Sequence, residues 1–142
     1  MSGTLLRLSY ELVPGDLALA GEASSSVKKK LTQLGLKPEV IKKAAVSMYE
    51  AEMNAIIHAY GGTMKVTIDG EKIVIVVEDK GPGIKDLELA MQEGYSTASD
   101  NIREMGFGAG MGLPNMKKHA DRLDIETEVG KGTCVKMVIY LQ

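Results

Sequence analysis

The strongest constraint on the fold is a long helical pattern over residues 39–60, most of whose circumference is apolar. A helix of this kind should be largely buried. Four polar residues nevertheless recur at intervals of three and four along one side: Ser47, Glu50, Asn54 and His58. Because an unpartnered carboxylate inside a core is unfavourable, this stripe either meets water or faces a functional site. The helix by itself leaves both interpretations open.

The segments around this helix read as paired strands rather than as strand–helix–strand crossovers. Strands are predicted at 4–13, 64–68, 73–77, 122–129 and 134–141, and helices at 17–34, 39–60, 86–93 and 114–120. Asp16, Gly35 and Pro38 mark helix ends, and Asp69-Gly70 is a strong hairpin signal. The strand at 73–77 lacks alternation, which predicts a central or doubly covered strand.

The order of these elements defines the predicted fold class. A chain of 142 residues is long enough for one domain with a real core, here residues 1–142. The economical packing is an α/β fold, a two-layer α/β sandwich with a mixed, mostly antiparallel sheet and its helices on one face.

Composition narrows the classes of function. The net charge of -2 does not indicate a nucleic-acid or anionic-membrane partner, and aromatic residues, at 4%, are too scarce for a base-stacking surface. The single cysteine, Cys134, lies in an apolar run and is interpreted as a small core residue. One cysteine fits a reducing compartment, and no signal-peptide or membrane-length pattern is found. A cytoplasmic location is therefore expected.

Two glycine-containing stretches have the chemistry of a ligand site. Asp79 ends a strand and precedes a rigid turn, Gly81-Pro82-Gly83, that lets a ligand approach the backbone; an ordinary surface turn is the alternative. Residues 106–113 alternate glycines just before a helix, which suits phosphate oxygens; a flexible linker is the alternative. This run matches neither the dinucleotide fingerprint nor the Walker A pattern. The stretch 94–112 is long enough to predict a functional or mobile loop.

Glu50 and Asn54 lie one helical turn apart and have the chemistry of a general base and of an oxygen ligand for Mg²⁺. A helix cap or a solvated edge is the alternative. Glu52 falls on a different face of the helix, so no catalytic role is assigned to it. The two histidines, His58 and His119, have no cysteine or carboxylate at metal-site spacing, and no nucleophilic triad can be assembled.

Taken together and in this order, four motifs resemble those of the GHKL ATP-binding superfamily, which includes gyrase, sensor histidine kinases, the large heat-shock chaperone and the mismatch-repair ATPase. They are an N box at residues 50–60, a D-x-G-x-G box at 79–84, the glycine-rich end of an ATP lid at 106–113, and the pair Gly132-Thr133. Residues 54–58 and 94–97 look most like the bacterial anti-sigma-factor serine/threonine kinases. The resemblance implies a Bergerat fold that uses ATP and Mg²⁺.

The resemblance also implies roles for the matching residues. Glu50 would be the general base, Asn54 would ligate Mg²⁺, and Asp79 would accept a hydrogen bond from the adenine amino group. The other nucleotide-contacting positions would be Gly81, Gly83, Ile84, Gly108, Gly110, Met111, Gly112, Leu113 and Thr133. Among these, the lid glycines would donate backbone N–H groups to the phosphates, and Thr133 would lie beside the adenine.

The implied activity is transfer of the ATP γ-phosphate to a serine or threonine of a STAS-domain anti-anti-sigma partner. Kinases of this group often hold a sigma factor and form dimers. Here the lid continues into Leu113-Pro114-Asn115, which looks closer to the branch that phosphorylates a STAS scaffold than to the branch that clamps a sigma factor. Two alternatives stay open: an ATP-gated protein that binds a sigma factor or another regulator with little turnover, and a detached histidine-kinase catalytic domain.

Overall fold

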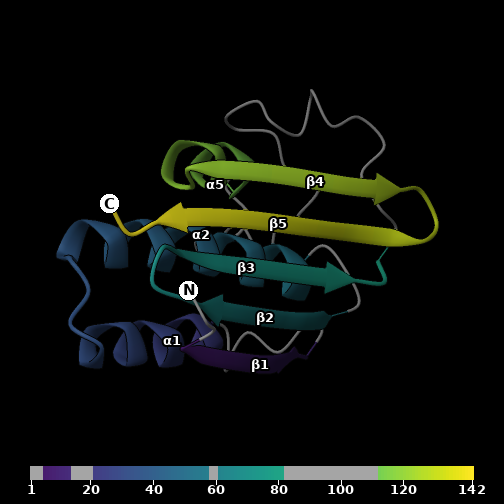
Figure 1. The fold of residues 1–142 in the computed structure, drawn as a ribbon. Helices are drawn as coiled ribbons and strands as arrows, with labels where there is room; N and C mark the ends of the chain where they lie inside the picture. The colour runs from purple at the N-terminus through teal and green to yellow at the C-terminus, as the bar shows by residue number, and fades with distance from the viewer. Residues whose placement is uncertain (1–4, 14–20, 58–60, 82–111) are drawn as a thin grey trace, which may run out of the picture.

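In the computed structural model, which describes residues 5–13, 21–57, 61–81 and 112–142, five strands form one sheet (Figure 1). The elements in chain order are β1 (Leu6–Leu12), α1 (Glu22–Gln33), α2 (Pro38–Ile57), β2 (Gly62–Ile68), β3 (Lys72–Asp79), α5 (Gly112–His119), β4 (Arg122–Glu128) and β5 (Gly132–Tyr140). The strand order is β1-β2-β3-β5-β4, and every pair among these strands is antiparallel. Strand β3 is central, as its unbroken apolar run predicts.

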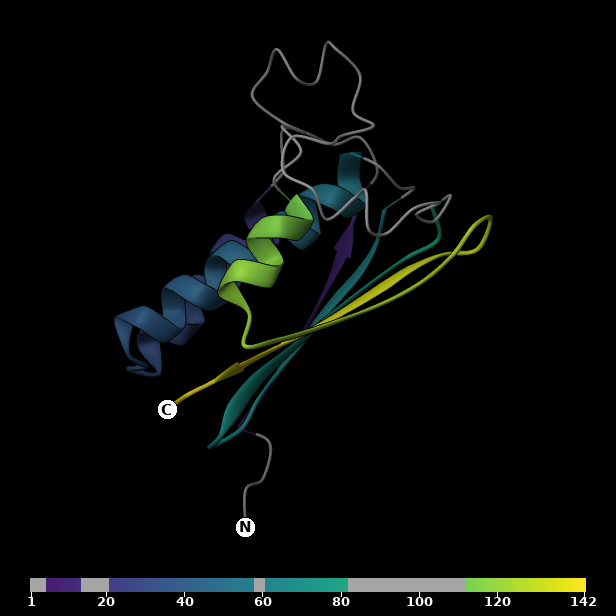
Figure 2. The same cartoon turned by 90° about the horizontal axis from the view of Figure 1, so that it is seen from above.

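The helices lie on one face of the sheet, which Figure 2 shows edge-on. Helix α2 lies behind the middle of the sheet, with α1 toward β1 and α5 toward β4 (Figure 1). The predicted two-layer α/β sandwich is therefore confirmed. None of the described helices is long and apolar enough to cross a bilayer.

The core lies between α2 and the inward-facing side chains of the sheet. Alternate residues of β2, β3 and β5 are buried there: Met64, Val66, Ile68, Ile73, Ile75, Val77, Val135, Met137 and Ile139. Helix α2 presents small side chains to them, with Ala44, Ala51 and Ala55 all buried. The larger Met48 and Ile56 of α2 are buried in the same core, and this packing holds the helix against the sheet.

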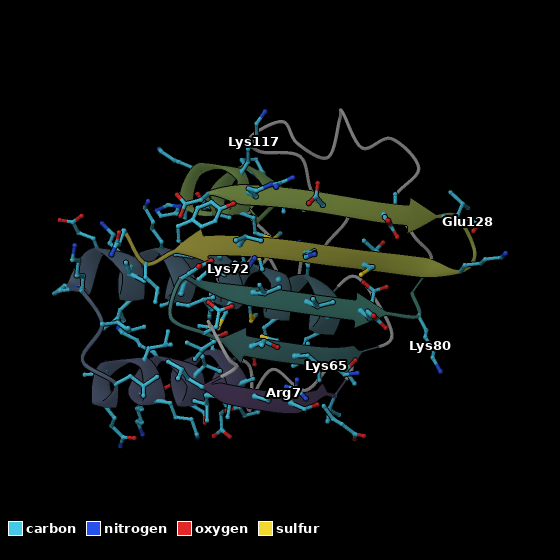
Figure 3. All side chains as sticks on the ribbon, viewed as in Figure 1. Arg7, Lys65, Lys72, Lys80, Lys117 and Glu128 are labelled. Atoms are coloured by element: carbon cyan, nitrogen blue, oxygen red, sulfur yellow. The ribbon has the colours of Figure 1, made fainter. Side chains whose placement is uncertain are left out.

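The opposite face of the sheet is uncovered in the described part of the chain and carries charged side chains. Arg7 and Lys65 are exposed there, and Figure 3 shows both on the strands that face the viewer. Cys134 also lies on this face, paired in register with Glu78 and Glu126. The expectation that Cys134 is a core residue is wrong: the thiol is half-buried, because the inward positions of β5 are the odd-numbered ones.

Several local predictions are confirmed by the turns. Gly35 follows α1 with φ 75, and α2 begins at Pro38. The Asp69 carboxylate accepts hydrogen bonds from the main-chain N–H groups of Glu71 and Lys72, so Glu71 belongs to the hairpin loop. Gly61 has φ 79 and donates its N–H to the carbonyl oxygen of Ala55, which ends α2.

The first helix differs from its predicted start. α1 begins at Glu22, after Gly21 with φ 90, rather than after Asp16. The difference arises from tertiary structure, because a side chain of α2, Glu52, caps the N-terminus of α1. The predicted helix at 86–93 and most of the predicted loop at 94–112 lie outside the described residues.

Candidate functional site

Asp79 stands at the end of the central strand, between β2 and β5. Its Oδ1 accepts a hydrogen bond from the Gly81 N–H at 2.9 Å and another from the Thr133 N–H at 3.2 Å. The first bond comes from the turn after β3 and the second from the neighbouring strand. Within the described residues, Oδ2 has no hydrogen-bond partner. The carboxylate is thus fixed by one oxygen and offers the other to a donor.

Two glycines allow the strands to meet closely at Asp79. Gly62 of β2 and Gly132 of β5 flank this end of β3 in the sheet. A Cβ on Gly62 would stand 2.0 Å from the carbonyl oxygen of Glu78, and one on Gly132 would stand 2.1 Å from that of Asp79. Gly132 also has φ +125, a conformation that other residues rarely adopt. The glycine of the Gly132-Thr133 motif is therefore required by the backbone around Asp79.

Thr133 is nearly buried and faces the helical layer. Its hydroxyl forms a hydrogen bond with the hydroxyl of Thr127 at 2.9 Å, which fixes the side chain against β4. A hollow of about 320 Å³ lies at this end of the sheet. Its wall includes Asp79 and Thr133 but also Glu78, Glu126 and Cys134 of the uncovered face, so it is not enclosed between the sheet and the helices. The predicted pair Asp79 and Thr133 is thus brought together by the sheet, although 54 positions separate the two residues.

Glu50, in the middle of the polar stripe of α2, lies beside α5. The ion pair between Lys43 and Asp121, at 3.0 Å, joins the N-terminal part of α2 to the residue just after α5. Glu50 contacts Asn115 in the middle of α5, so the two helices run antiparallel. The start of α5, at Gly112, therefore lies toward the end of α2 that carries Asn54, which is half-buried. His58 lies outside the described residues.

Glu50 is half-buried between these helices. Burial raises the pKa of the Glu50 carboxyl, while a hydrogen bond from the Asn115 side chain and the charge of His119 act in the opposite direction. A carboxylate in such surroundings holds a proton more readily than one in water, which suits a group that must accept a proton and release it again.

Ser47 begins the stripe and is fully buried. Its hydroxyl has no hydrogen-bond partner among the described residues. The side chains of the stripe therefore differ in solvent exposure: Ser47 is buried, whereas Glu50 and Asn54 are half-buried.

Glu52 has a structural role that the sequence did not reveal. Its buried carboxylate accepts hydrogen bonds from the main-chain N–H groups of Gly21, Ala23 and Ser24, at 3.1, 3.3 and 3.0 Å, and from the Ser24 hydroxyl. These are the donors that the start of a helix leaves unsatisfied. Glu52 therefore caps α1 from α2, and a charge at a helix N-terminus is favourable. Its assignment to a face away from Glu50 agrees with this position.

The remaining predicted site residues divide into two groups. Gly81 is buried beside Asp79, Gly112 is the first residue of α5, and Leu113 packs in the core. The others lie outside the described residues: Gly83, Ile84, Gly108, Gly110 and Met111.

Asn115 and His119 were missed as members of the site. Their spacing of four on α5 places them on one side of that helix, which the sequence could have shown. No sequence rule, however, pairs that side with Glu50, because the contact depends on how α2 and α5 pack.

The family model for the histidine kinase-like ATPase domain matches residues 13–139, nearly the whole chain. The chain belongs to the histidine kinase-like ATPase family. Membership of this family implies the use of ATP, and it confirms the GHKL resemblance drawn from the four motifs.

The curated relatives of this ATPase domain include an anti-sigma factor and a serine/threonine-protein kinase. The domain is 43% identical over 104 residues to an anti-sigma F factor of Thermoanaerobacter sp. (strain X514), covering 70% of this chain and 68% of the relative. It is 28% identical over 133 residues to the serine/threonine-protein kinase RsbT of Bacillus subtilis (strain 168), covering 89% of this chain and 90% of the relative.

Solved structures support the fold of the domain. The RsbU and RsbW domains of a Mycobacterium tuberculosis protein match with a TM-score of 0.61 at 15% identity, over 96% of this chain and 32% of that chain. A mycobacterial sensor histidine kinase, MprB, matches with a TM-score of 0.52 at 17% identity, over 95% of this chain and 97% of that chain. At these identities the likeness concerns the fold alone.

Proposed function

We propose that this chain is an ATP-dependent protein serine/threonine kinase that acts as an anti-sigma regulatory factor. It would transfer the ATP γ-phosphate to a serine or threonine of a STAS-type anti-anti-sigma partner. The names of the anti-sigma F factor and RsbT relatives support this proposal. The observation that carries it is the anchored carboxylate of Asp79.

Asp79 suits the amino group of adenine. Oδ1 is held by the N–H groups of Gly81 and Thr133, so Oδ2 is directed by two main-chain contacts rather than by a mobile side chain. An exocyclic amine is a donor, and a fixed carboxylate oxygen is the acceptor it needs.

The helix that carries Asn54 suits Mg²⁺ and phosphate. Asn54 offers a half-buried carbonyl oxygen, the hard ligand type that Mg²⁺ prefers alongside phosphate oxygens and water. The start of α5 lies toward the same end of α2, and the N–H groups of a helix N-terminus favour anions. Asn54 would help to hold a bound Mg²⁺, which would supply positive charge against the phosphates.

Glu50 is the proposed base for phosphotransfer. The substrate hydroxyl oxygen would form a bond to the γ-phosphorus, the bond from that phosphorus to the β–γ bridging oxygen would break, and ADP would leave. The hydroxyl proton would pass to the Glu50 carboxylate. The half-buried position of Glu50 supports this role, because burial raises the pKa of its carboxyl and so favours proton acceptance.

A second candidate function is ATP-gated binding of a sigma factor with little turnover, favoured by the 43% identity to an anti-sigma F factor. A pull-down with and without ATP and Mg²⁺, followed by phosphosite mapping on the captured protein, separates the candidates. Acid-stable phosphoserine or phosphothreonine supports the kinase proposal. Acid-labile phosphohistidine points instead to a histidine-kinase catalytic domain, and nucleotide-dependent capture without transfer points to sequestration.

Two further properties follow from the same proposal. We place the protein in the cytoplasm, where sigma factors act, and we propose that it forms a homodimer. Light scattering at several protein concentrations tests the dimer, and fractionation of cells that express the protein tests the location.

A further inference from the structure

Asn115 and His119 lie against Glu50, although no sequence motif assigns either of them a role. They are one turn apart on α5, and both are half-buried. Burial raises the pKa of the Glu50 carboxyl, and Asn115 and His119 both lie close enough to it to lower that pKa, Asn115 as a side-chain donor and His119 through its charge. α5 packs beside α2 in both views (Figures 1 and 2).

The ring of His119 is held by the helix that carries it. Its Nδ1 is 2.9 Å from the main-chain oxygen of Asn115. Because a carbonyl oxygen only accepts, Nδ1 must carry the proton and donate it. The ring therefore keeps a defined tautomer and orientation beside Glu50.

The helix itself is firmly attached to the molecule. Leu113 and Met116 of α5 are buried in the core, with exposures of 6% and 0%. At the far end of the contact with α2, Lys43 and Asp121 form an ion pair, and Asp121 also accepts a hydrogen bond from the Tyr140 N–H at 2.8 Å. Asn115 and His119 thus approach Glu50 from a rigid element rather than from a loop.

We propose that Asn115 and His119 are positioning residues that hold the Glu50 carboxylate in the orientation from which it accepts the substrate proton. This inference rests on the proposed function. A half-buried carboxylate loses hydration, and a donated hydrogen bond together with a neighbouring cation stabilises its charged form. Proton transfer also requires the base to be within hydrogen-bond reach of the hydroxyl, so its orientation matters as much as its charge.

The sharpest test is Asn115→Asp, which keeps the shape of the side chain but replaces the donor by a second carboxylate. We expect kcat for phosphotransfer to fall by about 10- to 100-fold while the KM for ATP stays within about twofold. The acidic limb of the kcat profile should move to higher pH. The neighbouring titratable groups are His119 on α5 and Tyr49 on α2, and burial chiefly raises the pKa of Tyr49.

His119→Gln tests the second residue. Glutamine retains a hydrogen-bonding side chain but cannot carry the positive charge. We expect a smaller loss in kcat, about 2- to 5-fold, because a partly exposed charge is screened by water. A kcat equal to that of the wild type over the whole pH range would remove His119 from the proposal.

Lys43→Gln is the matched control, because it breaks the ion pair at the other end of the same two helices and leaves Glu50 untouched. Its kcat should stay within about twofold of the wild type. If Lys43→Gln and Asn115→Asp lose the same activity, both simply loosen the contact between α2 and α5, and the positioning role is overturned.

A measurement without turnover separates this inference from the proposed function. ¹³C NMR titration of the Glu50 carboxyl, identified by its absence in Glu50→Gln, should show a higher pKa in Asn115→Asp and no change in Lys43→Gln. An unchanged Glu50 titration overturns the positioning role even if the wild type transfers phosphate. If the Glu50 titration changes in Asn115→Asp but the wild type transfers no phosphate, the contact between Asn115 and Glu50 is supported and the proposed kinase function is overturned. Should Asn115→Asp fail to fold, Asn115→Ala carries the same test, because it removes the donor without adding charge.

Discussion

The main-chain N–H of Thr133 donates a hydrogen bond to Oδ1 of Asp79 over 3.2 Å, joining two motifs that lie 54 residues apart. The bond runs between neighbouring strands at the point where both carry functional residues. One carboxylate oxygen accepts from the turn and from the neighbouring strand, and the other has no hydrogen-bond partner among the described residues. The carboxylate of Asp79 thus joins two strands and, under the proposed function, is also the acceptor for the adenine amino group.

Asp79→Asn should weaken ATP binding by about 10- to 100-fold. Asparagine has one acceptor oxygen and one amide nitrogen. If the oxygen faces Gly81 and Thr133, the amide nitrogen faces the adenine amine; if it is turned round, the nitrogen faces two main-chain donors. Titration calorimetry with ATP measures the change. Asp124→Asn, an exposed position on β4, is the control and should bind like the wild type. Equal affinity in both variants would place adenine elsewhere.

Glu50→Gln should reduce phosphotransfer at least about 100-fold while leaving ATP affinity near that of the wild type. Glutamine fills the same space but cannot accept the hydroxyl proton. Single-turnover transfer to the partner protein gives the rate, and equilibrium titration gives the affinity. Retained transfer would mean that another group takes the proton, or that positioning of the substrate suffices.

The same variant should change stability with pH in a defined direction. Burial raises the folded-state pKa of Glu50 above its ordinary value of 4.5. Stability from this group is therefore present below the unfolded pKa and lost as the pH rises through the folded pKa. Glu50→Gln, which never ionises, should be more stable than the wild type at neutral pH, and this advantage should disappear in acid. Urea unfolding at both pH values tests it; an advantage that grows in acid would contradict the sign.

Gly132→Ala should lower the free energy of unfolding by about 2–4 kcal/mol. The new Cβ would stand 2.1 Å from the Asp79 carbonyl oxygen, at a φ of +125 that alanine rarely adopts. ATP affinity should fall as well, since the strand that holds Asp79 must move. Gly70→Ala is the control: a Cβ there meets nothing within 4 Å, so its stability should stay within about 0.5 kcal/mol of the wild type.

Glu52→Gln should lower the free energy of unfolding by about 2–4 kcal/mol. Both carboxylate oxygens of Glu52 accept hydrogen bonds from main-chain N–H groups, those of Gly21, Ala23 and Ser24. In glutamine one oxygen is replaced by an amide nitrogen, which would put a donor opposite one of these N–H groups. Denaturant unfolding, compared with Glu71→Gln in the exposed hairpin loop, isolates the effect. If the two variants are equally stable, Glu52 does not hold α1 in place.

Local chemistry explains which parts of the fold were predictable. Asp69, Gly35 and Pro38 act through their own backbone and near neighbours, so their turns and helix ends could be predicted from sequence. The start of α1 could not, because its cap comes from Glu52 on another helix. Cys134 was misplaced for a related reason: an apolar run does not reveal which residues of a strand face the helices.

The sequence by itself determined the order of the elements, the family motifs and the identity of Glu50, Asn54 and Asp79 as the groups with the right chemistry. These features depend on residue type and short-range spacing. Only the tertiary structure decided which oxygen of Asp79 is occupied, why β5 needs Gly132, and that Asn115 and His119 meet Glu50. Those relationships arise where strands pair or helices pack across long stretches of chain, and spacing along one element carries no information about the surface that meets it.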